Sequence, residues 1–255
     1  MTVTVKTLAQ AAGVSRGTVD RVLHNRGSVK KELELKIRTL AKELGYVPNR
    51  GGRAVASIKD RYKIGIMLPS IGNAFFEGVI EGIDKAIEEY KELGVEVIVK
   101  KVQGYNEEVH LGAIEELKRS GCAALCLATI DTPKVADKIN ECQKLGIKII
   151  LVNSDVHNTK KICYVGSDYI KAGKTCAGLL SLISKQPKLD ILVVTGSKLM
   201  CGHRQRIEGF KEELEALKVD FNICAQIESN DSDITAQIET SKYLKEHQNI
   251  NCVYV

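Results

Sequence analysis

The strongest constraint on the fold is the alternation of apolar runs and amphipathic stretches from Tyr62 onward. The pattern predicts strands over residues 62–68, 95–101, 122–128 and 147–152 and helices over 73–93, 107–120 and 133–145. The strand segments are apolar almost without interruption, as expected for strands covered on both faces, and the joins are short and contain glycine. The sequence therefore predicts an α/β fold with a doubly wound parallel sheet.

A second series of the same kind follows a short polar break at residues 157–161. It predicts strands over 163–165, 190–195, 220–226 and 251–255 and helices over 169–184, 202–217 and 231–246. We therefore expect two similar lobes, residues 62–160 and residues 161–255. Because Val255 lies inside the last expected strand, we expect the second lobe to be incomplete in this chain.

The N-terminal stretch predicts a different, all-α unit. Val5, Leu8, Ala9 and Ala12 recur at helical spacing, and Gly13 then supplies the positive φ that a tight turn needs. Ser15 is a good N-cap for a second helix, whose apolar face is Val19, Val22 and Leu23. A third helix over residues 28–44 closes the core. Two short helices joined by a glycine turn form the helix-turn-helix pattern, whose second helix usually reads the DNA major groove.

Charge is distributed unevenly between these parts. The 255-residue chain carries a net charge of +5, yet residues 1–61 hold 13 basic and 5 acidic side chains, whereas the remainder holds 24 and 27. A basic head on a mildly acidic body indicates a polyanionic partner for the head alone.

Composition also bears on compartment and cofactors. The sequence has no run of 18 apolar residues and no signal-like N-terminus, so we expect a soluble, cytoplasmic protein with no membrane partner. The eight cysteines form no C-x-x-C pair and the five histidines show no metal-ligand spacing. We therefore expect buried, reduced thiols, with no metal site and no cofactor.

A resemblance adds to this interpretation. The run A-x-x-A-G-V-S-x-x-T-V-x-R-V-L (Ala9–Leu23), followed by LGYVPNR (Leu44–Arg50), resembles the lactose-repressor family of bacterial transcription regulators. The resemblance implies a DNA-binding domain over residues 1–48, a hinge or linker over 49–61, and a two-lobed effector domain like periplasmic sugar-binding proteins. It also implies a homodimer that binds a pseudo-palindromic operator and represses transcription.

On this basis the residues expected to contact DNA are Thr4, Lys6, Ser15, Arg16, Gly17, Thr18, Asp20, Arg21, Asn25, Tyr46, Asn49, Arg50, Arg53 and Val55. Arginine suits bidentate contact with guanine, and Arg16, Gly17 and Arg21 are the expected base readers. Asp20 stands where the family often has serine and favours a cytosine amino group, which predicts a divergent operator preference. At the start of the third helix Lys30 stands where the family usually has a phosphate-binding serine, and Lys30 or Lys31 is expected to supply a charge to the phosphate instead.

The hinge, residues 49–56, is expected to fold in the minor groove when two copies meet on DNA, with Val55 as the apolar wedge. Gly51 and Gly52 each cost about 1 kcal/mol of helix propensity, which favours a hinge that is unfolded away from DNA. The alternative is a plain flexible linker.

An effector is expected beyond the carboxyl ends of the strands, where the two lobes face each other. The first loop there resembles the N-P-F-F loop of sugar-binding relatives, with Ala74 in place of proline, and offers Asn73, Phe75 and Phe76. The alternative is that both aromatic rings pack between the lobes. In the second loop Asn153 and Ser154 stand where relatives often have D-R. Asp155 either compensates for the missing arginine or begins a turn.

The third loop ends in the pattern R-x-x-G-F. By this pattern Arg206 resembles the arginine that lines the cleft in the family. The planar guanidinium of arginine can bind two neighbouring hydroxyls or a carboxylate. The alternative is a solvated helix arginine. Arg204 and His203 are weaker candidates for effector contact. Asp231 is expected to be an N-cap, an effector contact, or both. A pentose, hexose or cyclitol is the expected effector, a nucleobase is the alternative, and either an inducer or a corepressor is compatible with the pattern.

Two other functions compete with a DNA-binding regulator. An enzyme on the same lobes is disfavoured because the chain has no G-x-G-x-x-G after its first strand, no G-x-x-x-x-G-K-[ST] and no G-x-S-x-G. We therefore expect no catalytic residues. A small-molecule-binding protein of the transport type would have a signal peptide and no basic head.

Overall fold

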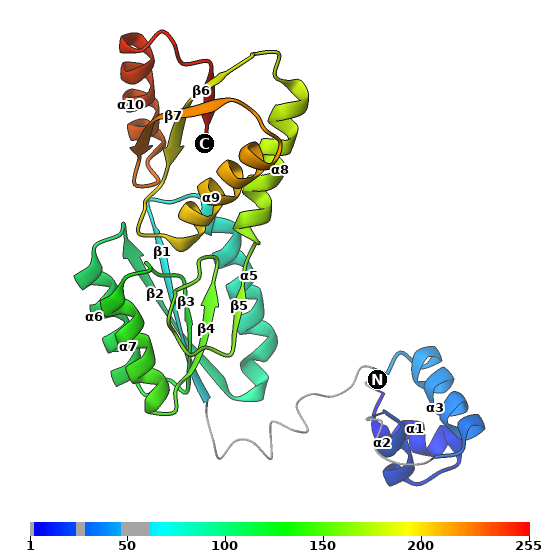
Figure 1. Ribbon diagram of the computed structural model, residues 1–255. Coiled ribbons are helices and arrows are strands. Elements are labelled where there is room, and N and C mark those ends of the chain that lie inside the picture. The colour runs from blue at the N-terminus through cyan, green and yellow to red at the C-terminus, as the bar shows by residue number, and fades with distance from the viewer. Residues whose placement is uncertain (1–2, 24–28, 47–61) are drawn as a thin grey trace. The chain divides into compact units, whose positions relative to one another are not determined.

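The computed structural model describes residues 3–23, 29–46 and 62–255, and its chain forms two compact units, residues 1–59 and 60–255 (Figure 1). Among the described residues of the first unit, three helices pack around one apolar core. The helices are α1 (Val5–Ala12), α2 (Arg16–Leu23) and α3 (Lys31–Glu43). The buried core residues are Leu8, Ala9, Ala12, Val19, Val22, Ile37 and Ala41. The predicted helix-turn-helix is confirmed, with α3 beginning at Lys31.

The helix ends of this unit are closed by local hydrogen bonds. Gly13 ends α1 in the left-handed conformation, with φ of 71°, as its position in the turn requires. Ser15 begins α2, and its hydroxyl accepts a hydrogen bond from the Thr18 amide at 3.2 Å. From α3, Lys36 donates to the Ala12 carbonyl at 3.4 Å and Arg38 to the Val22 carbonyl at 3.1 Å. Cations of α3 thus satisfy the carbonyl ends of both preceding helices.

The second unit begins with a parallel sheet. Within residues 62–255, this sheet has five strands in the order β2-β1-β3-β4-β5. The strands are β1 (Tyr62–Ile71), β2 (Val95–Gln103), β3 (Ala124–Leu127), β4 (Lys148–Val152) and β5 (Cys163–Val165). The helices are α5 (Phe75–Tyr90), followed by the 3-10 turn Lys91–Leu93, α6 (Glu107–Arg119) and α7 (Pro133–Lys144). The order of strands is that of a doubly wound fold, as predicted.

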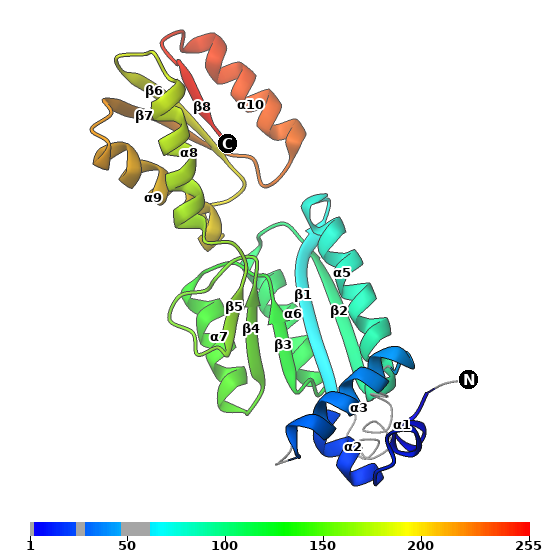
Figure 2. The same cartoon turned by 90° about the vertical axis from the view of Figure 1, so that its right-hand side faces the viewer.

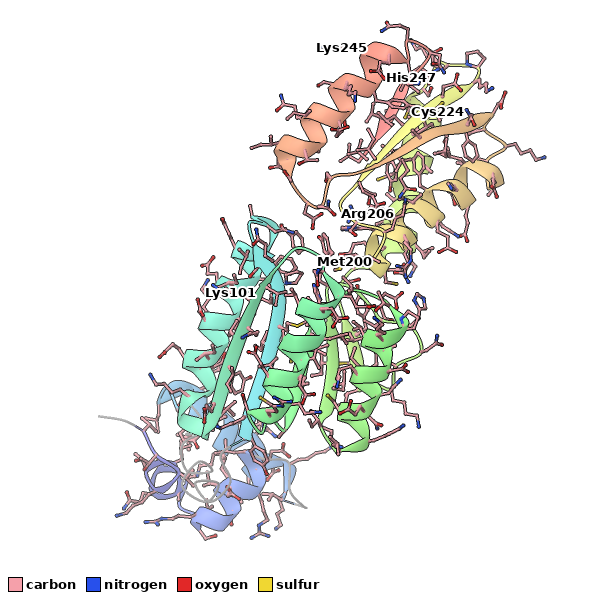
Figure 3. All side chains as sticks on the ribbon, turned by 90° about the vertical axis from the view of Figure 1, so that its left-hand side faces the viewer. Lys101, Met200, Arg206, Cys224, Lys245 and His247 are labelled. Carbon is pink, nitrogen blue, oxygen red and sulfur yellow. The ribbon has the colours of Figure 1, made fainter. Side chains whose placement is uncertain are left out.

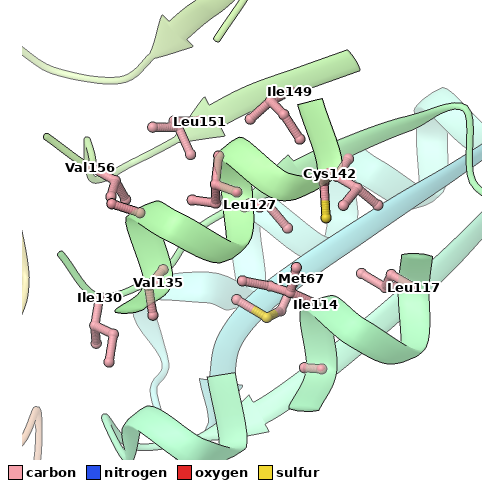
Figure 4. Close-up of a cluster of buried hydrophobic side chains, with 14 of the residues drawn as sticks. Met67, Ile114, Leu117, Leu127, Ile130, Val135, Cys142, Ile149, Leu151 and Val156 are labelled. Atoms are coloured by element: carbon pink, nitrogen blue, oxygen red, sulfur yellow. The ribbon is translucent and has the colours of Figure 1, made fainter. Parts of the chain in front are cut away.

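The core of this first lobe lies between the sheet and the helices α6 and α7 (Figure 4). Met67, Leu127 and Ile149 from the sheet meet Ile114 and Val135 from the helices. The opposite face of the sheet carries a smaller cluster beneath α5, containing Leu68, Phe76 and Ala128. Both faces of the strands are therefore used, which explains their nearly continuous apolar sequence.

One strand belongs to a different sheet from the one expected. The sequence pattern assigns residues 163–165 to the start of the second lobe, but β5 pairs in parallel with β4 through Ile150–Cys163 and Val152–Val165. It is therefore the edge strand of the first lobe. The sequence of a three-residue strand is too short to indicate which strand it pairs with. The sheet to which β5 belongs is therefore determined by the geometry of strand pairing and not by local sequence.

The second lobe is a smaller layered structure. Among residues 166–255 the strands pair in parallel in the order β7-β6-β8. The strands are β6 (Leu189–Thr195), β7 (Phe221–Glu228) and β8 (Cys252–Tyr254), and the helices are α8 (Tyr169–Ile183), α9 (Cys201–Ala216) and α10 (Asp233–Glu246). Figure 2 shows α8 and α9 on one side of the sheet and α10 on the other. The core lies on the α8 and α9 side, where Phe210 stacks on Tyr254 with ring centres 3.9 Å apart.

The cysteines are free thiols, but not all of them are buried as expected. Cys122, Cys142 and Cys201 are buried, whereas Cys163 and Cys176 are exposed. Cys163 lies on the edge strand β5 and Cys176 on α8. Both are surrounded by apolar sequence, yet their own side chains are not buried in a core.

Helices α8 and α9 approach each other so closely that their backbones touch. A Cβ atom on Gly173 would overlap the Arg206 carbonyl oxygen and lie 2.6 Å from the Phe210 nitrogen. A Cβ atom on Gly209 would in the same way overlap the carbonyl oxygen of Ile170. The glycine of R-x-x-G-F is therefore required by packing, and the pair of helices fixes where Arg206 stands.

We predict that Gly173→Ala lowers the free energy of unfolding by about 1–3 kcal/mol, because an added methyl group has to push two backbones apart. The matched control is Gly178→Ala on the same helix, where a Cβ atom meets no neighbour within 4 Å. That change should leave stability unchanged or raise it by up to about 1 kcal/mol. Urea unfolding of both variants tests the prediction, and equal effects would contradict it.

Candidate functional site

A cavity of about 610 Å³ lies between the two lobes of the second unit. The first lobe contributes the loop after β1, Tyr105 after β2 and Asn153 after β4. The second lobe contributes the ends of β6 and β7, the start of α8 and one face of α9. Figure 3 shows Arg206 and Met200 where the second lobe meets the first. The cavity therefore lies at the carboxyl ends of both sheets, where the parallel arrangement predicts a ligand.

Most of the predicted effector residues line this cavity. They are Asn73, Phe75, Phe76, Asn153, Arg206 and Asp231. Asp155 does not line it, because its carboxylate accepts hydrogen bonds from the Val156 amide at 2.7 Å and from Lys161 at 2.6 Å. Of the two alternatives for Asp155, the structure favours the turn.

Arg206 is held at the cavity wall by an aromatic ring. Its guanidinium carbon lies 5.1 Å from the centre of the Tyr169 ring, within the range of a cation–π contact. The Tyr169 hydroxyl in turn donates to Asn153 Oδ1 at 2.7 Å. Asn153 adopts a left-handed conformation with φ of 62°, which asparagine tolerates better than most residues. This chain of contacts runs from α9 through α8 to the first lobe, so Arg206 is not a solvated surface arginine.

Asp231 forms a second connection between the lobes. Its carboxylate accepts hydrogen bonds from Asn73 Nδ2 at 2.9 Å and from the Tyr105 hydroxyl. Burial raises the pKa of Asp231 above its ordinary value, and the Asn73 bond opposes that shift. Of the two roles expected for Asp231, N-cap and effector contact, the N-cap is not supported by the structure. Ser232 caps α10 instead, by accepting the Thr235 amide at 3.2 Å.

The two phenylalanines of the first loop have different environments. Phe76 is 2% exposed and packs in the cluster beneath α5, whereas Phe75 is 60% exposed. Their rings meet edge to face with centres 5.2 Å apart. Asn73 Oδ1 accepts the Phe75 amide at 3.0 Å and fixes the start of α5. Phe75 therefore has an open apolar face, while Phe76 mainly supports the loop.

Among the lining residues that were not predicted from the sequence are Tyr105 and Tyr169. Of the two weaker candidates, His203 lines the cavity and Arg204 does not. His203 Nδ1 lies 2.9 Å from the Ser197 amide nitrogen and 3.1 Å from the Ser197 carbonyl oxygen, so the Ser197 backbone orients the ring. Burial lowers the pKa of His203, and the charge of Arg206 adds to that effect, while a hydrogen bond to Ser197 opposes it. The available signal was helical spacing, since His203 and Arg206 are three residues apart on one helix.

In the first unit, most of the predicted DNA-contact residues that the structure describes are exposed. Thr4, Lys6, Ser15, Arg16, Gly17 and Arg21 are exposed, and Thr18, Asp20 and Tyr46 are half-buried. Thr4 also caps α1, and Tyr46 packs against the three-helix core. The predicted contacts Asn25, Asn49, Arg50, Arg53 and Val55 lie outside the described residues, as does the whole predicted hinge.

None of the described helices is both long enough and apolar enough to span a lipid bilayer.

We predict that His203 contributes to loss of stability in mild acid. Folding lowers the pKa of His203 below its unfolded value of about 6.5. The stability that depends on neutral His203 is therefore fully present above about pH 6.5 and is lost as the pH falls below that value. His203→Gln should therefore reduce the fall in unfolding free energy between about pH 7.5 and 5.5. Urea unfolding across this range measures both curves, and parallel curves would contradict the prediction.

Comparison with known proteins identifies both parts of the chain. Residues 64–255 match the periplasmic binding protein domain, and residues 4–49 match the bacterial regulatory proteins of the lacI family. The probable transcriptional repressor ExuR of Bacillus subtilis (strain 168) is 26% identical over 216 residues, which are 83% of this chain and 60% of that protein. The chain thus spans about 60–65% of the length of the first curated relatives that it matches.

Solved structures agree in fold. The glucose-galactose binding protein GanP of Geobacillus stearothermophilus has a TM-score of 0.67 at 22% identity, over 76% of this chain and 68% of that one. The lac repressor dimer bound to operator and the anti-inducer ONPF has a TM-score of 0.60 at 20% identity, over 99% of this chain and 73% of that one. Since the two matched segments cover nearly all the described residues, the chain belongs to the lacI family of bacterial regulatory proteins, with a helix-turn-helix unit followed by a periplasmic-binding-protein domain.

Proposed function

We propose that this protein is a sequence-specific DNA-binding regulator of transcription, acting as a repressor. The observation that carries the proposal is the exposed polar side of α2. Val19 and Val22 are buried in the three-helix core, while Arg16, Gly17 and Arg21 are exposed. A second helix that presents arginines in this way can enter the major groove, where arginine reads guanine through two hydrogen bonds.

In this proposal the chain acts as a homodimer in the cytoplasm. Residues 1–48 bind DNA, residues 49–61 form the hinge, and the two lobes follow, with the second lobe beginning after β5. A dimer places two recognition helices about 34 Å apart, which matches the half-sites of a pseudo-palindromic operator. The relatives are transcriptional regulators, which supports a regulatory and not an enzymatic role.

We further propose that a small polar effector, a sugar or polyol, binds in the cavity and controls operator affinity. The donors and acceptors there suit a polyhydroxyl compound, since Arg206 donates, Asp231 accepts, His203 offers a ring nitrogen and Phe75 offers an apolar face. Contacts from both lobes meet in the cavity, so an effector that bridges them changes the balance between lobe arrangements. Effector affinity and operator affinity are then linked reciprocally.

The DNA-binding proposal predicts distinct effects of two head substitutions. After operator selection from random duplexes, Arg16→Ala should weaken binding about 5–150-fold and relax the preference at one base pair, because a bidentate contact supplies about 1–3 kcal/mol. Lys6→Ala should weaken binding to all sequences equally and reduce the salt dependence. Lys42→Ala, on the exposed side of α3, is the control. Failure to select any sequence would contradict the proposal.

The effector proposal predicts a rise in melting temperature with one member of a panel of pentoses, hexoses, cyclitols and nucleobases, because ligand stabilises the folded state by mass action. Arg206→Ala should weaken that ligand about 10–100-fold, as expected for loss of a charged hydrogen bond. Arg119→Ala on α6, whose side chain is 78% exposed, is the control. Equal binding by Arg206→Ala and wild type would rule out the assigned cavity.

A further inference from the structure

A second group of functional side chains lies outside the cavity, also where the lobes meet. Asp131 follows β3, His157 follows β4, and Cys201 is the first residue of α9. Cys201 Sγ lies 3.8 Å from His157 Nδ1, which lies 2.6 Å from Asp131 Oδ2. The potential ligand atoms of the three side chains are all within 4.8 Å of one another. None of the three residues lines the effector cavity.

The backbone around this cluster is fixed by contacts between the lobes. The Asp131 amide donates to the Leu199 carbonyl at 2.7 Å, and the Gly202 amide donates to Ser154 Oγ at 3.2 Å. Between them, Met200 is 3% exposed and packs in the core of the first lobe. The start of α9 is therefore anchored on both sides of Cys201, and the cluster does not depend on a mobile surface loop.

We propose that Asp131, His157 and Cys201 form a binding site for a divalent transition metal ion of the zinc type. One carboxylate, one imidazole and one thiolate are the ligand types that Zn²⁺ takes in proteins, with water in a fourth position. Tetrahedral zinc with the usual bond lengths separates its ligand atoms by about 3.3–3.7 Å. The Cys201–His157 distance is already close to that range, and the His157–Asp131 distance has to widen by less than about 1 Å.

The proton balance of binding is simple. The Cys201 thiol loses its proton to solvent, and the proton of a neutral His157 moves to Nε2, which frees Nδ1 for the metal. Asp131 is already an acceptor, because its Oδ1 binds the His157 amide at 2.9 Å and its Oδ2 binds the His157 ring. The side chain of His157 is 61% exposed, so an ion can reach the cluster from solvent.

Arg204 is the group that opposes metal binding. Its guanidinium donates to Asp131 Oδ2 and also to the Lys198 carbonyl at 2.6 Å. The side chain is 39% exposed, so it can leave Asp131 and keep its second bond or turn to water. Arg204 thus occupies Asp131 when no metal is bound and competes with the metal for that carboxylate. This competition gives the proposal a distinctive consequence, because removing Arg204 should tighten metal binding.

The test is a Co²⁺ titration of the reduced, chelator-treated protein, followed by absorption spectroscopy. A cysteine ligand gives a near-ultraviolet thiolate-to-cobalt charge-transfer band, which Zn²⁺ should abolish by displacement. Cys201→Ser should remove the band. His157→Gln should weaken Co²⁺ binding by at least about tenfold, since even residues that only support metal ligands cost that much. Arg204→Gln should strengthen Co²⁺ binding.

Two control variants separate this site from non-specific binding. Cys176→Ser removes an exposed thiol of α8, and His247→Gln removes a histidine after α10; both should retain the band. Circular dichroism establishes whether each variant is folded. If Cys201→Ser fails to fold, His157→Gln and Arg204→Gln still decide the question. Absence of a band in wild type, its persistence in Cys201→Ser, or weaker Co²⁺ binding by Arg204→Gln would overturn the proposal.

Discussion

The burial of Met200 inside the core of the first lobe is the constraint on which both sites depend. Met200 belongs to the second lobe in sequence, yet its side chain completes the apolar layer of the first. The following turns of α9 therefore begin at a fixed point between the lobes. His203 and Arg206 line the effector cavity, while Cys201 and Arg204 point to the cluster with Asp131. The first turns of α9 thus contribute residues to both polar sites, the effector cavity and the cluster around Asp131.

Local sequence predicted the fold well, because burial on both faces gives each parallel strand a nearly continuous apolar run. It also found the cavity loops, since parallel strands bring their carboxyl ends to one edge. It failed where partners are distant in the chain. Residues 163–165 pair with the sheet of the first lobe and not with that of the second. Asp231 binds Asn73 instead of capping α10. Asp131 and His157, 26 residues apart, form a hydrogen bond that no sequence motif indicates. Such pairings depend on the tertiary structure and leave no local pattern.

The two connections across the cavity differ in chemical character. On one side, Arg206 rests on the Tyr169 ring and Tyr169 donates to Asn153. On the other side, Asp231, a carboxylate partly removed from water, receives donors from Asn73 and Tyr105. A polar molecule entering the cavity has to satisfy or replace these partners, because buried polar groups without hydrogen bonds are costly. The proposed effector therefore acts through the same bonds that already join the lobes.

The close contact between α8 and α9 has a consequence for how recognition is divided. Because backbone meets backbone at Gly173 and Gly209, with no flexible side chains between them, the two helices cannot slide past each other without a clash. Tyr169 and Arg206 are therefore carried as one rigid body. In the proposed regulation, this part of the cavity wall keeps its shape when the lobes change their arrangement, whereas the bonds from Asn153, Asn73 and Tyr105 to the second lobe can open or close. In the proposed effector site, the second lobe therefore presents a surface of fixed shape, and the bonds to the first lobe depend on how the two lobes are arranged.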